Sequence, residues 1–355
     1  MRIEQIQTPA LVVDLDILEE NQRTMNALVA DCPAKLRPHY KSNKCTAIAH
    51  MQIAAGAKGI TCAKLGEARD LVEAGIEDVL IANQIIDLGK IAEVARLAGC
   101  CRLSIAVDEA QNIRDLETAA AAQGTHIHCL IEYEIGMGRC GVSTPEALLE
   151  LAQLIHSCPH LTFEGIQAYA GHLSHEANAQ VRAELGAGVE SRLKEAKAYL
   201  EAHGLAVPQV SGCSTASVRD HALPDTVYTE FQPGSYLFMD AAYHPLADLP
   251  FHNSLFVLAT VMSKGNGKTI TDVGMKAVST DQLPPVFLGY EEYPVELSEE
   301  HSAVLIPEND KQIGDKMWLI PSHCCTCINI YDWLYFIRDG KVVNKIPVNS
   351  RGKSV

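Results

Sequence analysis

The stretch KLRPHYKSNK, residues 35 to 44, gathers lysine, arginine and histidine side chains in a chain whose formal net charge is -15. Lys41 is the candidate reagent because it closes a short apolar run, where an ammonium group is partly desolvated. Arg37 and His39 are expected to surround it with further positive charge. Burial and nearby cations favour the neutral amine, which can attack a carbonyl carbon to form a Schiff base. An arbitrary lysine is usually a solvated surface residue, so the assignment depends on the elements around Lys41.

Alternating short and long periodic segments predict the fold that positions this lysine. Segments with helical periodicity, such as 65–75, 87–99 and 144–157, lie between apolar runs, and several end at a glycine that suits a left-handed C-cap. Eight such βα units predict an α/β fold of the (β/α)8 TIM-barrel type over residues 8–245. A doubly wound sheet is the competing fold, but no GxGxxG fingerprint follows the first strand. The predicted strands lie near residues 36–41, 59–63, 79–82, 103–107, 127–133, 163–169, 208–212 and 227–232.

The pattern changes after about residue 245. Stretches such as SLFVLATVMS and KVVNKIPV alternate apolar and polar residues, and turn signals such as KGNGK and RDGK divide them. This pattern predicts a C-terminal antiparallel β domain over residues 246–355. The opening run PALVVDLD makes residues 1–15 the candidate for one more strand of that domain.

The C-terminal ends of the predicted barrel strands carry polar side chains that would meet at one rim. Barrel enzymes commonly bind phosphate in the loops after strands seven and eight, and the segments SGCSTAS and QPGSY supply small, hydroxyl-bearing residues there. A phosphorylated ligand is therefore expected. The rim residues are Lys41 after strand one, Arg139 after strand five, His172 and His175 after strand six, Ser214 and Thr215 after strand seven, and Gly234, Ser235 and Tyr236 after strand eight.

The segment SHCCTC in the β domain is a second reactive element. On a strand, residues two apart point to the same face, so His323 and Cys325 could hold one metal ion while Cys324 points away. Two protein ligands leave coordination positions open, as a catalytic metal requires. The alternative is a core histidine beside a buried thiol.

Composition excludes several classes of partner. The acidic balance argues against nucleic acid, which requires a basic face. No apolar run has membrane-spanning length and no signal-like segment opens the chain, so the expected address is cytoplasmic, with no membrane partner. The 12 cysteines are scattered over patterns typical of buried strands and helices, which favours reduced thiols.

Five motifs in the same order resemble those of a known family: RPHYK, GITCAKLGEA, EYEIGMGRCGV, TEFQPGSYLFMDAAY and SHCCTCINIYDW. They are similar to the D-threonine aldolase and D-serine dehydratase family of fold-type III, alanine-racemase-like enzymes. The resemblance implies pyridoxal 5'-phosphate on Lys41, Arg139 at the pyridine nitrogen, and Tyr236, ahead of Tyr169, beside the cofactor. It also implies a metal on His323 and Cys325, and a homodimer with active sites near the subunit interface.

The two branches of the family differ at one metal ligand. The aldolases carry an Asp where this chain has Cys325, which suits Mn2+ or Mg2+, whereas the dehydratases carry His-x-Cys, and a thiolate favours Zn2+. GMGRCGV and TEFQPGSYLFMDAAY look more like the aldolases. Two other departures are SNK after Lys41, where a histidine is usual, and Cys213 and Ser214 in a loop that is typically richer in glycine.

The resemblance implies a lyase of β-hydroxy-D-amino acids as small-molecule substrates. In the aldolase reaction His172, with His175 as an alternative, takes the hydroxyl proton, and the products are glycine and an aldehyde. In the dehydratase reaction, the alternative, Lys41 removes the α-proton and the products are a 2-oxo acid and ammonia. A racemase and, from another class, a non-catalytic pyridoxal-phosphate carrier are also weighed. A β domain with the His323 and Cys325 pair argues against both.

Overall fold

The computed structural model describes residues 1–306 and 311–355, which form two compact units. We refer to them as the barrel unit and the β unit. The domain boundary expected at residues 245/246 can be compared with the division at Gly234/Ser235. The barrel unit comprises Asn26–Lys41, Ile48–Gly234 and Lys353–Val355, and the β unit comprises Met1–Met25, Ser42–Ala47 and Ser235–Gly352.

The barrel unit contains eight parallel strands in the order β2-β9-β8-β7-β6-β5-β4-β3. The sheet curls until its two ends meet, where His39 bridges Thr61 and the Thr61 N–H donates to the Pro38 carbonyl at 2.9 Å. The predicted barrel class is therefore confirmed. The strands are β2 (Lys35–Leu36), β3 (Ile60–Cys62), β4 (Asp78–Ile81), β5 (Arg102–Val107), β6 (Ile127–Glu132), β7 (Leu161–Ala168), β8 (Gln209–Gly212) and β9 (Glu230–Phe231).

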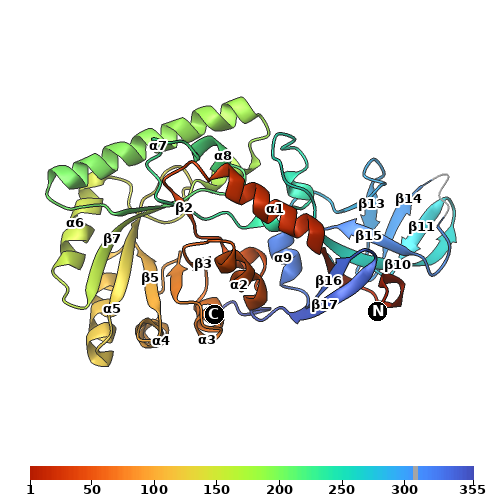
Figure 1. Cartoon of the computed structure of the whole chain (residues 1–355), viewed down its shortest axis with the longest axis horizontal. Helices are drawn as coiled ribbons and strands as arrows, with labels where there is room; N and C mark the ends of the chain where they lie inside the picture. Colours follow the sequence, from red (N-terminus) through yellow and green to blue (C-terminus); the bar gives the residue numbers. More distant parts are fainter. Residues whose placement is uncertain (307–310) are drawn as a thin grey trace. The chain divides into compact units, whose positions relative to one another are not determined.

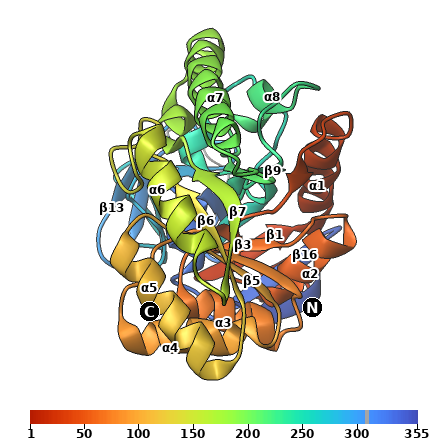
Figure 2. The same ribbon diagram turned by 90° about the vertical axis from the view of Figure 1, so that its left-hand side faces the viewer.

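Helices connect these strands and lie outside the sheet (Figure 2). Their ends follow local chemistry: Asp87 caps α4 by accepting from the Lys90 N–H, and Thr144 caps α6 ahead of Pro145. Helix α5 ends at Gly124, whose φ of 62° is the left-handed C-cap conformation. The helices are α2 (Thr46–Ala54), α3 (Leu65–Glu73), α4 (Leu88–Ala98), α5 (Ala110–Gln123), α6 (Pro145–His156), α7 (Ala179–Ala202) and α8 (Val218–His221).

The β unit is built on a second, mostly antiparallel sheet, whose main path is β13-β14-β11-β10-β1-β16-β17, with β15 on β10 and β12 on β15. Strand β1 pairs antiparallel to β10 and parallel to β16 (Figure 1). The KGNGK turn places Asn266 and Gly267 at φ 53° and 75°, the two left-handed residues that a tight hairpin requires. The strands are β1 (Ala10–Asp14), β10 (Leu255–Gly265), β11 (Lys268–Thr271), β12 (Val286–Phe287), β13 (Val295–Leu297), β14 (Ser302–Leu305), β15 (Lys316–Ile320), β16 (Trp333–Arg338) and β17 (Lys341–Pro347).

Two further helices complete the elements, α1 (Leu15–Leu28) and the short α9 (Cys324–Ile328). Across the described residues, no helix combines the length and apolar character that spanning a bilayer requires.

Gly165 gives a test of the barrel packing. It lies at a register shift between β6 and β7, with φ +139°, and a Cβ there would lie 1.9 Å from the Gln209 carbonyl oxygen of β8. Because backbone cannot move aside as a flexible side chain can, we expect Gly165→Ala to destabilise the fold by at least about 3 kcal/mol. Gly188→Ala, on an exposed turn of α7 with open space around the new Cβ, should change stability by at most about 1 kcal/mol.

Urea unfolding of the two variants provides the measurement. Equal unfolding midpoints for Gly165→Ala and the unmodified protein would show that the β7–β8 contact is looser than described.

Candidate active site

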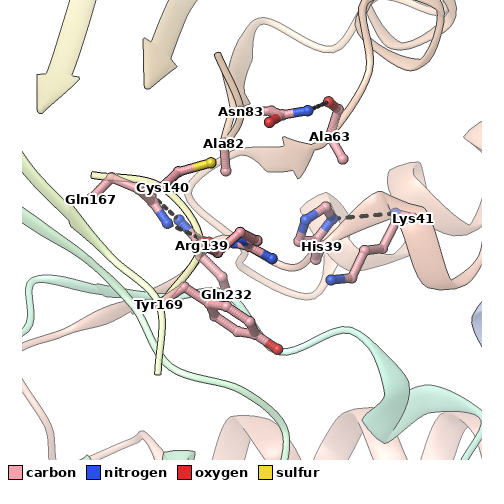
Figure 3. Close-up of a pocket in the computed structure, with 10 residues that line it drawn as sticks. All are labelled: His39, Lys41, Ala63, Ala82, Asn83, Arg139, Cys140, Gln167, Tyr169 and Gln232. Atoms are coloured by element: carbon pink, nitrogen blue, oxygen red, sulfur yellow. Dashed lines mark hydrogen bonds between the residues drawn. The ribbon is translucent and has the colours of Figure 1, made fainter. Parts of the chain in front are cut away.

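A cavity of about 270 Å³ opens at the C-terminal ends of the barrel strands (Figure 3). Lys41, Arg139 and Tyr169, which the sequence assigned to the rim, meet in it. Two loops missing from the prediction also contribute, because Ala63 and Asn83 follow β3 and β4. The residues that line the cavity are His39, Lys41, Ala63, Ala82, Asn83, Arg139, Cys140, Gln167, Tyr169 and Gln232.

Lys41 and Arg139 share one aromatic ring. The Lys41 Nζ lies 5.4 Å from the centroid of the Tyr169 ring, and the Arg139 Cζ lies 5.8 Å from the same centroid. Lys41 sits in a 3-10 turn, Tyr40–Ser42, where its backbone N–H donates to His39 Nδ1 at 3.3 Å. Tyr169 stabilises both cations through the negative face of its ring. The half-buried Lys41 amine therefore faces the cavity in defined surroundings.

Arg37 does not join this group, so the expectation that it surrounds Lys41 with charge is wrong. Its side chain has no solvent exposure, and its guanidinium binds Asp78 at 2.7 Å and Glu230 at 3.0 Å. Burial acts to lower the pKa of Arg37, but the two carboxylates raise it above its ordinary value. Asp78 and Glu230 are the first residues of β4 and β9, so Arg37 points toward the opposite end of the strands from Lys41.

The loop that carries Arg139 is folded by carboxylates that the sequence prediction did not include. Glu134 Oε1 accepts from the backbone N–H of Gly136 at 2.7 Å and of Gly138 at 2.8 Å. The hydrogen bonds from Gly138 and Gly136 lower the pKa of Glu134. Glu132 lies 3.8 Å from the Arg139 guanidinium, and burial raises the pKa of this carboxyl. The signal available in the sequence was a carboxylate two residues ahead of Gly-x-Gly.

His172 lies against the same loop, since a Cβ on Gly136 would come within 2.6 Å of the imidazole Cε1. It belongs to the 3-10 segment Gly171–His175 and is exposed, as is His175. Neither histidine is among the described residues that line the cavity. The assignment of His172 as a base stays a prediction.

The loop after β8 is compact and buried. The Ser214 N–H donates to Ser217 Oγ at 3.0 Å, and the N–H groups of Ser217 and Val218 donate to the Ser214 carbonyl. Cys213 holds a left-handed φ of 66°, the conformation for which a glycine is usual. Thr215 is buried beside Ser214. The phosphate-binding roles of Ser214, Thr215 and Gly234 stay predictions.

Glu190 and His221 support this loop from beneath. Their side chains are hydrogen bonded at 3.2 Å, and the second oxygen of Glu190 accepts from the Val227 N–H at 2.8 Å. Burial acts to raise the pKa of Glu190, but the hydrogen bonds from His221 and Val227 prevail and lower it to about 2. The charged carboxylate therefore ties α7 to the loop.

In the β unit, SHCCTC is not a strand, so the strand geometry assumed for His323 and Cys325 is wrong. His323 is an extended residue directly ahead of α9. The Cys324 N–H donates to Asp240 Oδ2 at 2.7 Å, and Ser279 Oγ exchanges hydrogen bonds with the His323 backbone, which starts the helix at Cys324. Burial raises the pKa of Asp240 to about 6.

His323 and Cys325 nevertheless come together, through a side-chain hydrogen bond. Asp281 Oδ2 accepts from His323 Nδ1 at 3.0 Å, and Asp281 Oδ1 accepts from Thr326 Oγ1 at 2.6 Å. Burial alone would lower the pKa of His323, but Cys325 and Asp281 raise it to about 10. A histidine oriented by a carboxylate and set beside a thiol fits a divalent metal such as zinc.

The described residues offer no group of three or more His, Cys, Asp or Glu side chains that could hold a metal ion. A metal on His323 and Cys325 would therefore keep open positions, as a catalytic ion does. Ser235 Oγ lies 4.0 Å from Cys325 Sγ. Tyr236 is fully buried and donates to Gln22 Oε1 at 2.9 Å, so within the β unit it is a satisfied core tyrosine, and its role beside a cofactor stays a prediction.

The SNK departure has a structural account within the β unit. Lys44 adopts φ 48° and is buried, with its Nζ donating to the Ser350 carbonyl at 3.3 Å and its own carbonyl accepting from the Ser350 N–H. This lysine anchors the segment after Lys41.

The chain matches two family models: the alanine racemase N-terminal domain over residues 13–242 and a serine dehydratase domain over residues 254–337. The chain therefore belongs to the alanine-racemase-like family of pyridoxal-phosphate enzymes that contains the D-threonine aldolases and D-serine dehydratases.

Within this family, aldolases match the chain over its whole length. A 3-hydroxy-D-aspartate aldolase of Paracoccus denitrificans is 38% identical over 98% of this chain and 93% of its own, and a D-threonine aldolase of Arthrobacter is 37% identical over 99% and 94%. A crystal structure of D-threonine aldolase from Filomicrobium marinum is similar with a TM-score of 0.97, 35% identity and coverage of 100% and 98%. A D-threo-3-hydroxyaspartate dehydratase from Delftia has a TM-score of 0.88, 25% identity and 98% coverage of both chains.

The Asp281 contact to His323 is testable through metal affinity. We expect Asp281→Ala to weaken zinc binding about tenfold to a hundredfold, because the imidazole loses the acceptor that fixes its orientation. Competition with a chromogenic chelator measures this affinity.

Asp16→Ala is the matched control, since Asp16 is an exposed carboxylate paired with a cation, Arg338, in the same unit. Equal zinc affinity in both variants would contradict a supporting role for Asp281.

Proposed function

We propose that this protein is a pyridoxal-phosphate- and divalent-metal-dependent lyase that cleaves D-threonine-type β-hydroxy-D-amino acids to glycine and an aldehyde. The observation that carries the proposal is the similarity of the whole chain to aldolases, together with the convergence of Lys41, Arg139 and Tyr169 in one rim cavity. We further propose a cytoplasmic homodimer whose partners are small molecules.

The cavity suits the cofactor by its charge. Among the described residues that line it, two are cations, Lys41 and Arg139, three are carboxamides, and none is Asp or Glu. A phosphorylated, anionic ligand is therefore favoured, and no lining carboxylate would hold a proton on a ring nitrogen. When bound, pyridoxal phosphate supplies an acceptor for the electron pair released at the substrate Cα.

The chain's own residues then have distinct roles. Lys41 attaches the cofactor, Arg139 contacts its pyridine nitrogen, and Tyr169 bounds the ring. His172 takes the proton of the β-hydroxyl group, the Cα–Cβ bond breaks with its electron pair left on Cα, the aldehyde departs, and Cα regains a proton to give glycine. Contacts to the phosphate come from Ser214, Thr215, Gly234 and Ser235, and Tyr236 also stands beside the cofactor.

His323 and Cys325 would hold the metal, which supplies Lewis acidity toward the β-hydroxyl oxygen. The thiol favours Zn2+, and Mn2+ or Mg2+ is the alternative that the aldolase branch implies.

Cys325 supports a second candidate, a dehydratase of D-serine or other D-3-hydroxyamino acids. In that reaction Lys41 removes the α-proton, hydroxide leaves from Cβ, and hydrolysis gives a 2-oxo acid and ammonia. The similarity to the Delftia dehydratase is consistent with it, but the aldolases match at higher identity.

A single assay separates these reactions. Protein supplied with pyridoxal phosphate and zinc or manganese is incubated with D-threonine, and acetaldehyde, glycine, 2-oxobutanoate and ammonia are measured together. We expect acetaldehyde with glycine, lost on chelation. Oxobutanoate with ammonia would identify the dehydratase instead.

The reagent lysine is tested in the same assay. Lys41→Ala should lower turnover at least about a thousandfold, because the cofactor loses its attachment point. Lys197→Ala, on the outer helix α7, is the control and should retain activity. Undiminished cofactor affinity in Lys41→Ala, with no turnover of D-threonine, D-serine or 3-hydroxy-D-aspartate by the unmodified protein, would favour the carrier.

A further inference from the structure

A chain of buried hydrogen bonds runs from the Arg37 ion pair to the floor of the cavity. Arg37 binds Glu230 at 3.0 Å, Ser211 Oγ donates to Glu230 Oε1 at 2.6 Å, and Gln232 Nε2 donates to Ser211 Oγ at 2.6 Å. Gln232 and Gln167 then pair through their carboxamides at 2.8 and 3.3 Å, and both line the cavity (Figure 3). The side chains in this chain belong to residues that are at most 3% exposed.

The direction of each bond follows from the one before it. An ionised Glu230, held between Arg37 and Lys58, can only accept hydrogen bonds. Ser211 therefore donates its single hydroxyl proton to Glu230, and its oxygen is left as an acceptor. The group of Gln232 that faces Ser211 must then be the amide nitrogen, which fixes which way this carboxamide is turned.

The same logic extends to the second amide. Gln232 Nε2 uses its two N–H groups on Ser211 Oγ and Gln167 Oε1, so Gln232 Oε1 remains the acceptor for Gln167 Nε2. Both amide groups are fixed end for end by a carboxylate that does not line the cavity. The floor thus presents a set pattern of oxygen and N–H groups.

We propose that Ser211 is a positioning residue, which transmits the orientation of Glu230 to Gln232 and Gln167 and so fixes the polar pattern under the ring of the bound cofactor. This inference rests on the proposed function, because it assigns that pattern to pyridoxal phosphate. A space-filling role alone would be met by an apolar side chain, as is usual inside such barrels. A fully satisfied polar network at this layer instead sets one arrangement of its members.

The test compares Ser211→Ala with Ser104→Ala. Ser104 is the matched control because it is a fully buried barrel serine on β5 that also donates to a glutamate, Glu164 at 3.3 Å, and it does not line the cavity. For each variant, the absorption maximum of bound pyridoxal phosphate and the cofactor dissociation constant are measured. We expect Ser211→Ala to move the maximum and to weaken binding about tenfold, a loss typical of one buried hydrogen bond. Ser104→Ala should change neither.

A double-mutant cycle shows whether Ser211 acts through Gln232. In a Gln232→Ala background, Ser211→Ala should produce no further spectral shift, whereas independent effects would add and would overturn the proposal. Ser211→Cys, which keeps the size of the side chain with a weaker donor, should give an intermediate shift and serves if the alanine variant does not fold.

The outcomes also separate this inference from the proposed function. A folded Ser211→Ala protein with the spectrum and affinity of the unmodified protein overturns the positioning role while the lyase stands. Failure of the unmodified protein to bind pyridoxal phosphate overturns both.

Discussion

The barrel unit depends on one buried charge, the guanidinium of Arg37. Removing a cation from water is costly unless it is paired, and removing one partner of such a group leaves an uncompensated charge. Asp78 and Glu230 supply the pairing from β4 and β9, so the ion pair joins strands on both sides of β2. This is where the sheet closes through only the His39–Thr61 bridge. Gly59 leaves room for the guanidinium, since a Cβ there would lie 2.5 Å from an Arg37 nitrogen.

The consequences of that pair reach the site in two directions. Along the backbone, the anchored β2 segment leads to His39 and Lys41 at the rim. Across the barrel, Glu230 orders Ser211 and then the two carboxamides on the cavity floor. The stability of the closure and the polarity of the cavity therefore share one carboxylate.

Other functional segments use the same physical device on a smaller scale. Glu134 folds the Arg139 loop by accepting from two backbone N–H groups, Glu190 clamps the loop after β8, and Asp281 holds the His323 ring. In each case a charged acceptor satisfies donors that an irregular segment leaves without secondary-structure partners. Loops that carry chemistry are thereby held without regular structure of their own.

The sequence by itself determined the eight barrel strands and the β sheet, because periodicity and turn residues act over a few neighbouring positions. It also placed Lys41, Arg139 and Tyr169 at one rim, because the C-terminal ends of parallel strands share an edge. Only the tertiary structure decided the partners of Arg37, the helical start at Cys324 and the Asp281 contact to His323. Those interactions join residues 193, 84 and 42 positions apart, and local patterns carry no information on which distant side chain will neutralise a buried charge or cap a helix.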